Sequence, residues 1–294
     1  MSNVVNKPNT TLTFSDEQAM ILESARDFCR DKSSIPAVRA LLESETGYDD
    51  QVWQEMVALG WPGLAIPEQY GGAGFGVGSL VPLAEAMGRS LLATPFFSSA
   101  LAAQALLRGG NSEQKEAWLP AIASGSIATL ALLDGEDWGD ERVQASAAGD
   151  AELELSGTKW YVTDAAVAEL LIVSVEVSGA PRLALVGGDQ LAPDAIQAHT
   201  LIDETKRAAK VILDGARIPA TALLDQADTV SLLRDLRLLG ALLTAAEATG
   251  TTAACLDTVV EYLNTRKQFG RLIGSYQSLK HPTVNILTGM DAAR

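Results

Sequence analysis

The hydrophobic pattern of the first part of the chain, residues 1–125, has the 3.6-residue period of α-helices. Ser15 with Gln18, and Asn111 with Gln114, have the spacing of capping boxes, in which two side chains close the first turn of a helix. The first box precedes a series of apolar residues on one helical face. We therefore predict a helical N-terminal domain, with helices that begin after residue 15 and cover residues 49–59, 81–92, 96–110 and 111–123.

The pattern changes over residues 126–226, where short apolar runs are separated by Gly, Pro and Asp. Several of these runs alternate apolar and polar residues, which is the period of half-buried antiparallel strands. The runs are IATLALL, AELELSG, KWYVT, ELLIVSVEV, PRLALVGG and AKVILDG. They predict an all-β middle domain, either an antiparallel β-barrel or a small sandwich.

A helical period returns in the last part, residues 227–294. The segment from Thr229 to Arg266 contains no proline and is longer than most helices of globular proteins. The turn FGRLIGS leads to a second helical segment, Tyr276 to Arg294. Such an αα-hairpin leaves an apolar side uncovered, so we expect an incomplete C-terminal helical bundle within an α+β fold. The missing helices come either from more C-terminal residues or from another subunit.

The charge of the chain limits its partners. Asp and Glu outnumber Lys and Arg by 37 to 22, which gives a formal net charge of −15. Phosphate backbones and anionic lipids repel such a chain, so we expect neither nucleic-acid nor membrane binding. An anionic ligand must instead be held by a local cluster of Arg, Lys and helix N-termini.

Cysteine usage and the N-terminus indicate a cytoplasmic protein. Cys29 and Cys255 have neither CxxC nor metal-ligand spacing, so we expect reduced residues in the core or just below the surface and no metal site. The first dozen residues, MSNVVNKPNTTL, are polar and lack an export or transit signal. No uncharged apolar stretch reaches the ~20 residues that a membrane-spanning helix needs.

The glycine-rich segment LGWPGLAIPEQYGGAGFG, residues 59–76, lacks the context of a dinucleotide-binding loop, because no strand precedes it and no βαβ unit surrounds it. We interpret Gly71, Gly72 and Gly74 as turn residues that let the backbone pass close to neighbouring helices. Contact with a substrate is the alternative. The segment resembles the N-terminal signature of the acyl-CoA dehydrogenases, a flavoprotein family whose order of α, β and long-helix domains matches this chain.

A second motif, GTKWYVTDA, covers residues 157–165. It resembles the strand on which acyl-CoA dehydrogenases place an aromatic ring against the flavin and, two positions later, a Thr near the flavin N5. The resemblance assigns these roles to Tyr161 and Thr163. Many members have Trp in place of Tyr161, and we expect Trp160 on the other face of the strand. The alternative is a cross-strand aromatic in an ordinary β core.

The third motif, TRKQFGRLIGSYQSLKH, covers residues 265–281. It resembles the RxxFG…Q arrangement with which the family reaches the FAD of a neighbouring subunit. The resemblance places Arg266 at the pyrophosphate, Phe269 near the adenosine and Gln277 at a polar contact across the subunit boundary. A planar guanidinium suits phosphate oxygens well. A lone Arg that only complements a helix C-terminus is the alternative.

The loop after the first strand departs from the family pattern. Members usually read close to TEPxxGSD there, whereas this chain reads LLDGEDWGDE over residues 132–141. Leu133 stands where the family has Thr, so side-chain contacts with flavin and substrate are lost. The backbone groups of Leu132 and Leu133 are still expected to bind the flavin edge.

No catalytic base is identified in this chain. Abstraction of the α-proton from an acyl thioester needs a carboxylate in an apolar site. Most members carry this Glu near the C-terminus, beyond residue 294, and a minority carry it in the long helix at the position of Gly240. Asp235 and Glu247 lie nearby but out of register.

The substrate-binding Arg of the family also has no direct counterpart, because its position falls on Ala241. Arg234 or Arg237, about one turn earlier, is expected to substitute for it, and Arg237 is our candidate.

The resemblance covers the chain from about Phe14 onward and implies FAD-dependent α,β-dehydrogenation of an acyl-CoA thioester in fatty acid metabolism. It also implies an electron-transferring flavoprotein as the partner that reoxidises FAD, and a homo- or hetero-oligomer, a dimer or a tetramer. Two explanations of the missing Glu stay open: a chain truncated at its C-terminus, and a non-catalytic flavin-binding subunit of a hetero-oligomer. A flavin-free scaffold is a third hypothesis.

Overall fold

The computed structural model describes residues 14–135, 144–147 and 151–294. The N-terminal part is helical, as predicted, and both capping boxes are present at its first and last helices. One short helix that the sequence pattern had not indicated follows the first. The helices are α1 (Asp16–Lys32), α2 (Ile35–Leu42), α3 (Asp50–Ala58), α4 (Leu80–Ser90), α5 (Phe96–Gly109) and α6 (Ser112–Ala123).

The middle part forms two sheets. Its strands are β1 (Ala128–Ala131), β2 (Gln144–Ala147), β3 (Glu152–Ser156), β4 (Thr158–Thr163), β5 (Leu170–Val177), β6 (Ala180–Gly187), β7 (Ile196–His199), β8 (Ala208–Ile212), β9 (Arg217–Pro219) and β10 (Leu223–Leu224). The larger sheet has the order β10-β6-β5-β2-β3-β9, with β1 also paired to β5. The smaller sheet has the order β4-β8-β7.

The larger sheet is mixed rather than wholly antiparallel as expected. β1 pairs with β5 in parallel, from Ala128 opposite Leu170 to Ala131 opposite Val173. A parallel pair needs a long crossover connection, and the chain between β1 and β5 supplies one because it contains β2, β3 and β4. Alternation of apolar residues cannot distinguish the two pairings.

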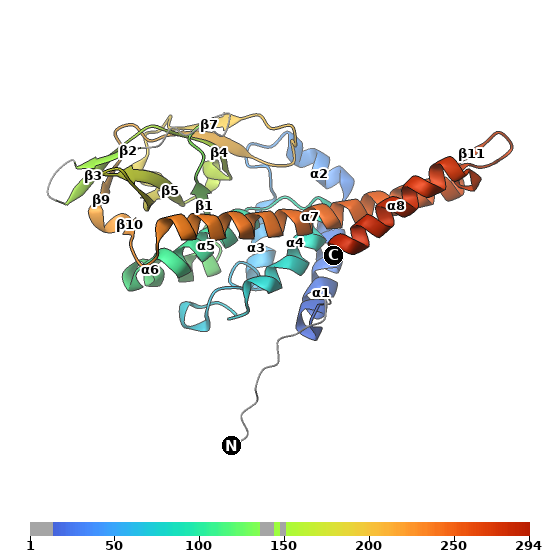
Figure 1. Cartoon of the computed structure of the whole chain (residues 1–294), viewed down its shortest axis with the longest axis horizontal. Coiled ribbons are helices and arrows are strands. Elements are labelled where there is room, and N and C mark those ends of the chain that lie inside the picture. The colour runs from blue at the N-terminus through green and yellow to red at the C-terminus, as the bar shows by residue number, and fades with distance from the viewer. Residues whose placement is uncertain (1–13, 136–143, 148–150) are drawn as a thin grey trace, which may run out of the picture.

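The C-terminal part is the predicted αα-hairpin. Helix α7 (Thr229–Thr265) leads through two short strands, β11 (Lys267–Gln268) and β12 (Arg271–Leu272), to α8 (Gln277–Ala293). Figure 1 shows that α7 runs along the body and then continues with α8 into a projecting arm. Helix α8 has no buried residue in this chain, so the expected uncovered apolar side is present.

Close contact between α4 and α7 depends on two glycines. A Cβ atom at Gly88 would lie 2.0 Å from the carbonyl oxygen of Glu247, and one at Gly250 would lie 1.9 Å from that of Glu85. Any larger residue therefore pushes the two helices apart. This contact fixes α7 on the body and leads the arm away from it.

The interpretation of the glycine-rich segment as a turn is confirmed. Gly71 and Gly74 have φ angles of 80° and 73°, which favour glycine. A Cβ atom at Gly72 would lie 2.1 Å from the carbonyl oxygen of Ile66 and 2.5 Å from that of Gly63. The close neighbour is thus the preceding loop rather than a helix.

One continuous core joins the helical and β parts. It includes Phe96 and Leu106 of α5, Leu171 of β5 and Leu236 of α7. The domain limits at residues 125 and 226 therefore stay predictions. No helix among the described residues combines the length and apolar character that crossing a membrane requires.

The two cysteines differ. Cys29 lies in the core as expected, and burial raises the pKa of its thiol to about 12. Cys255 is exposed on α7, so its expected place in the core or just below the surface is wrong. The apolar period of α7 includes residues on the face of the helix that this chain does not cover.

Candidate functional site

Strand β4 carries both residues expected at the flavin, and it has an irregularity between them. Its register against β8 shifts between Lys159 and Val162, and Tyr161 has a φ of 51°. The ring centroids of Tyr161 and Trp160 lie 4.8 and 6.0 Å from that of His199. The expectation that Trp160 lies on the opposite face is therefore wrong, because the bulge breaks the alternation of side chains.

Leu132 and Leu133 follow β1 and lie beside β4 and β5. The backbone N–H of Trp160 donates to the carbonyl oxygen of Leu133 at 2.8 Å. The hydroxyl of Ser174 donates to the carbonyl oxygen of Leu132 at 3.2 Å. The structure thus brings this backbone next to the strand that carries Tyr161, while residues 136–141 of the expected loop lie outside the described part of the chain.

A buried lysine lies beneath this junction. The side chain of Lys159 is 0% exposed, and its ammonium group forms an ion pair with Asp134 and donates to Ser174 Oγ at 2.7 Å. Burial lowers the pKa of Lys159, and the carboxylate of Asp134 partly opposes this effect. One buried charge on β4 therefore links Asp134 to Ser174 of β5.

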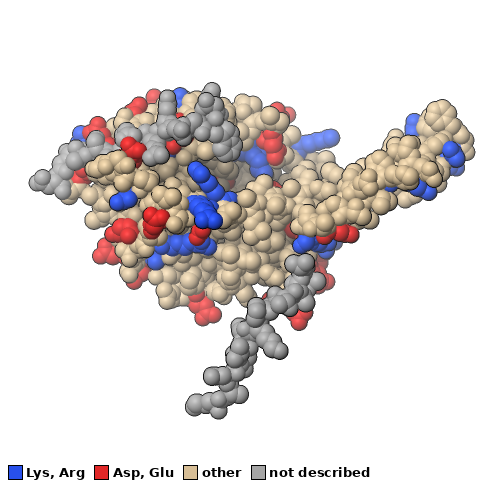
Figure 2. All heavy atoms as spheres, in the orientation of Figure 1, with Lys and Arg blue, Asp and Glu red and all other residues tan. Residues whose placement is uncertain are grey.

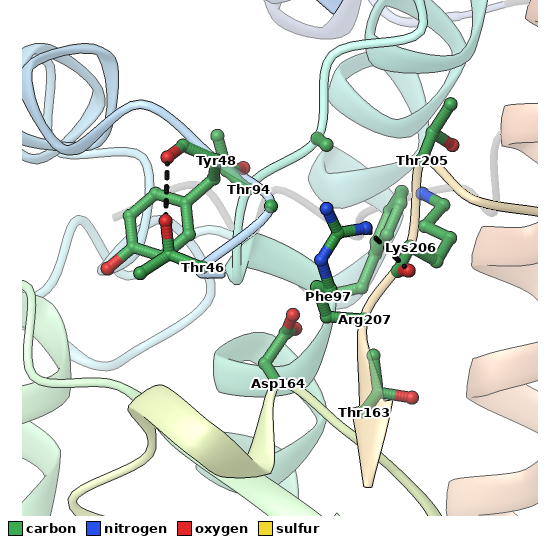
Figure 3. Close-up of a pocket in the computed structure, with 11 residues that line it drawn as sticks. Thr46, Tyr48, Thr94, Phe97, Thr163, Asp164, Thr205, Lys206 and Arg207 are labelled. Atoms are coloured by element: carbon green, nitrogen blue, oxygen red, sulfur yellow. Dashed lines mark hydrogen bonds between the residues drawn. The ribbon is translucent and has the colours of Figure 1, made fainter. Parts of the chain in front are cut away.

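Thr163 ends β4 at the wall of a cavity of about 30 Å³. Figure 3 shows that the wall comes from distant segments of the chain, among them Thr46 and Tyr48 after α2 and Thr94 and Phe97 near the start of α5. Thr94 Oγ1 is buried and has no hydrogen-bond partner in the described part of the chain. The cavity therefore offers a polar atom as well as an aromatic ring.

Asp164 follows Thr163 in the left-handed conformation, with a φ of 56°. Its carboxylate accepts a hydrogen bond from Ser98 Oγ, and its N–H donates to the carbonyl oxygen of Arg207 at 3.1 Å. Burial raises the pKa of Asp164 to about 6, although Ser98 and the charge of Lys206 oppose this effect. The end of β4 is thus anchored to α5 and to the segment before β8.

The wall of the cavity also contains two basic residues with fixed roles. The guanidinium group of Arg207 donates to the carbonyl oxygens of Leu41, Leu42 and Ser44 at 2.9, 3.0 and 2.9 Å, so it caps the end of α2. The ammonium group of Lys206 forms an ion pair with Glu247 of α7 and lies 5.3 Å from the centre of the Phe97 ring.

The carboxylates near the expected base position on α7 already have partners. Gly240 faces α5, because a Cβ atom there would lie 3.8 Å from Leu101 Cδ1. Glu247 pairs with Lys206, and Asp235 pairs with Arg108 at 2.9 Å.

The candidate substrate-binding residue Arg237 is exposed and does not line the cavity. Its role stays a prediction, as does that of Arg234, which is also exposed.

The third motif forms the tip of the arm. Arg266 follows α7, Gln277 begins α8, and Phe269 lies in the turn between β11 and β12 with a φ of 52° and 92% exposure. The guanidinium group of Arg271 lies 4.0 Å from the centre of the Tyr276 ring. Figure 1 shows the tip at the far end of the arm from β4, so one chain does not bring its Arg266 to its own Thr163.

Sequence reasoning missed three charged residues at this site: Lys159, Asp164 and Lys206. The first two lie inside the motif GTKWYVTDA, and the signal available for Lys159 was a charged residue within an apolar strand. Lys206 carried no such signal, because its neighbours in sequence are polar. Among the described residues, no group of three or more His, Cys, Asp and Glu is placed to hold a metal ion.

Two models of one protein family match this chain. Residues 15–126 match the acyl-CoA dehydrogenase N-terminal domain, and residues 238–294 match the acyl-CoA dehydrogenase C-terminal domain. The chain is 31% identical to the acyl-CoA dehydrogenase IpdE2 of Mycolicibacterium smegmatis over 284 residues. This alignment covers 95% of this chain and 75% of that protein.

Solved structures show the same fold. The ChsE4–ChsE5 complex of Mycobacterium tuberculosis matches with a TM-score of 0.83 and 27% identity, over 96% of this chain and 78% of that chain. A glutaryl-CoA dehydrogenase of Mycobacterium smegmatis, solved with FADH2, matches with a TM-score of 0.83 and 24% identity, over 95% of this chain and 75% of that chain.

Proposed function

The chain belongs to the acyl-CoA dehydrogenase family of oxidoreductases, and on this premise we propose that it binds FAD and contributes to the α,β-dehydrogenation of an acyl-CoA thioester. The observation that carries the proposal is the position of Thr163. This residue ends the strand that carries Tyr161 and lines a cavity together with Thr94 and Phe97. The expected flavin contact and a space for a small part of a substrate are therefore adjacent.

The residues present fit FAD. The Tyr161 ring is half-buried and Thr163 is exposed, so a flat ligand has access to an apolar wall and a hydroxyl group on one strand. Arg266 and Phe269 offer a guanidinium group and an exposed ring at the end of the arm. Bound FAD supplies the two-electron oxidant of the reaction.

The separation of these two groups supports a shared site. Because the arm carries Arg266 away from β4 of its own chain, we propose that Arg266, Phe269 and Gln277 serve the FAD of a neighbouring subunit. The exposed apolar residues of the arm, such as Val284 and Ile286, agree with an oligomer. The relative solved as the ChsE4–ChsE5 complex makes a hetero-oligomer a specific alternative to a homo-oligomer.

The base of the reaction is proposed to come from outside the described residues. Gly240 offers no side chain, and Glu247 and Asp235 are already ion-paired. Two sources of the Glu are consistent with this proposal: residues outside positions 1–294, and a catalytic partner of a non-catalytic flavin-binding subunit. An electron-transferring flavoprotein is the proposed reoxidant in both cases.

The test is a comparison of FAD and FMN binding by the assembled protein, with Arg266→Ala as the variant. FAD carries a pyrophosphate that FMN lacks, so Arg266→Ala should weaken FAD binding by ~1.5–3 kcal/mol and leave FMN binding unchanged. The matched control is Arg182→Ala, which removes an exposed arginine from the body. Equal affinity of the wild-type protein for FAD and FMN in fluorescence titrations would contradict the assignment.

A further inference from the structure

Lys159 is buried where an unpaired charge is costly. Its side chain is 0% exposed, and its ammonium group finds partners only in Asp134 and Ser174 among the described residues. Replacing a buried ion pair with apolar side chains is often neutral or stabilising, so fold stability alone does not account for a charge at this place.

The contacts of Lys159 converge on one short segment, Leu132 to Asp134. Asp134 receives the ammonium group directly, and Leu132 is reached through Ser174, whose hydroxyl accepts from Lys159 and donates to the Leu132 carbonyl oxygen. The residue between them, Leu133, is held by the backbone N–H of Trp160, the neighbour of Lys159 in β4. Three consecutive residues are thus fixed to β4 and β5.

The same strand continues from Lys159 to Tyr161 and Thr163. We propose that Lys159 is a positioning residue for the flavin: through Asp134 and Ser174 it fixes the backbone of Leu132 and Leu133 relative to Tyr161 and Thr163. The flavin edge and the flavin ring then meet groups that are already in place. This inference rests on the proposed FAD site, to which it adds a residue that does not itself touch the cofactor.

The test uses two variants of the full chain in its assembled form. Ser174→Ala removes the link from Lys159 to Leu132 but leaves the ion pair with Asp134, so this variant should keep the fold. Lys159→Met removes the charge at similar length. Each variant should raise the dissociation constant for FAD about tenfold, the change expected for one hydrogen bond to a charged group, and should alter the visible absorption band of the bound flavin.

Two controls separate positioning from general destabilisation. Ser156→Ala removes a hydroxyl group of β3 that donates a hydrogen bond to the carboxylate of Asp214 at 3.1 Å. Lys115→Met removes a lysine of α6. Both should keep the wild-type dissociation constant and absorption band. The inference is overturned if both test variants have a lower thermal midpoint than the wild type but keep its FAD affinity and its absorption spectrum. A lysine with a purely structural role gives that result.

The outcomes also separate this inference from the proposed function. If the wild-type assembly binds no FAD, the proposed function and the inference both fail. If the wild-type assembly binds FAD, and both variants bind FAD with the same affinity and the same spectrum as the wild type, the inference alone fails. If Lys159→Met does not fold, Ser174→Ala decides by the same criteria.

Discussion

Asp164 shows how strongly single residues at this site depend on their surroundings. Its carboxyl group is buried behind Thr163, with Ser98 Oγ as a direct partner and the ammonium group of Lys206 as the nearby charge. These neighbours favour the ionised form, yet burial dominates and raises the pKa to about 6. The nearby phenol of Tyr48 has its pKa raised by its own burial and by the charges of Asp50 and Asp164.

The raised pKa of Asp164 predicts a pH-dependent stability. The folded chain keeps the proton up to about pH 6, whereas the unfolded chain releases it near the ordinary value of 3.8. The folded state therefore loses stability as the pH rises from about 4 to about 6. Asp164→Asn cannot ionise, so its stability relative to the wild type should increase by roughly 2 kcal/mol between pH 4 and pH 7.5.

Urea unfolding of both proteins across this pH range measures the difference. Asp194→Asn, at an exposed position, is the control and should show no such pH dependence. A constant difference between Asp164→Asn and the wild type at every pH would show that Asp164 has the same pKa in both states.

At the scale of elements, the contact of α4 with α7 determines where the arm points. The N-terminal half of α7 buries Leu232, Leu236, Leu239 and Leu243 against the body, whereas the helix is mostly exposed beyond Gly250. Backbone approaches backbone at Gly250, and α7 keeps contact with α4 as far as Asp257, which forms an ion pair with Arg89.

Gly250→Ala should destabilise the chain, because its new methyl group would lie 1.9 Å from the carbonyl oxygen of Glu85. Overpacking of this kind costs ~1–3 kcal/mol. The matched control is Gly289→Ala in α8, where nothing lies within 4 Å. That change should be neutral or stabilising by up to ~1 kcal/mol, since Ala favours helix. Chemical denaturation of both variants measures the effects, and equal stability would contradict the close approach of the helices.

At the scale of the whole molecule, the arm differs from the acidic body in its charge and in the exposure of its apolar residues. Figure 2 shows Lys and Arg, and no Asp or Glu, on the visible face of its outer part. The sequence has no acidic residue between Glu261 and Asp291, whereas the chain as a whole carries −15. A basic, apolar arm on an acidic chain suits contact with an anionic ligand held by another subunit.

The 294-residue chain by itself should not dehydrogenate acyl-CoA. No free carboxylate stands at Gly240, and general acid–base groups contribute ~10²–10⁴ in rate, so only trace turnover is expected even with FAD bound. The measurement is anaerobic flavin bleaching by a panel of short, long, branched and steroid acyl-CoA thioesters. Rapid bleaching by any of them would identify a base within this chain, and Glu247→Gln and Asp235→Asn are then the first variants to make.

Several features were predictable because they are local. The capping boxes at Ser15 and Asn111, the long period of α7 and the turn at Gly71 each depend on residues within a few positions of one another. The family resemblance is also carried by continuous segments. The order of helical, β and helical parts therefore followed from the sequence, as did the uncovered side of the arm.

The rest of the site depends on partners that the sequence keeps apart. Lys159 lies 25 residues from Asp134, Lys206 lies 41 residues from Glu247, and Ser98 lies 66 residues from Asp164. The same holds for the parallel pairing of β1 with β5, because alternation does not specify a partner strand. The sequence determined which elements form and which family they belong to, since periodicity and capping act over a few residues. Only the tertiary structure decided which charges are buried together, because burial and pairing arise when distant elements pack.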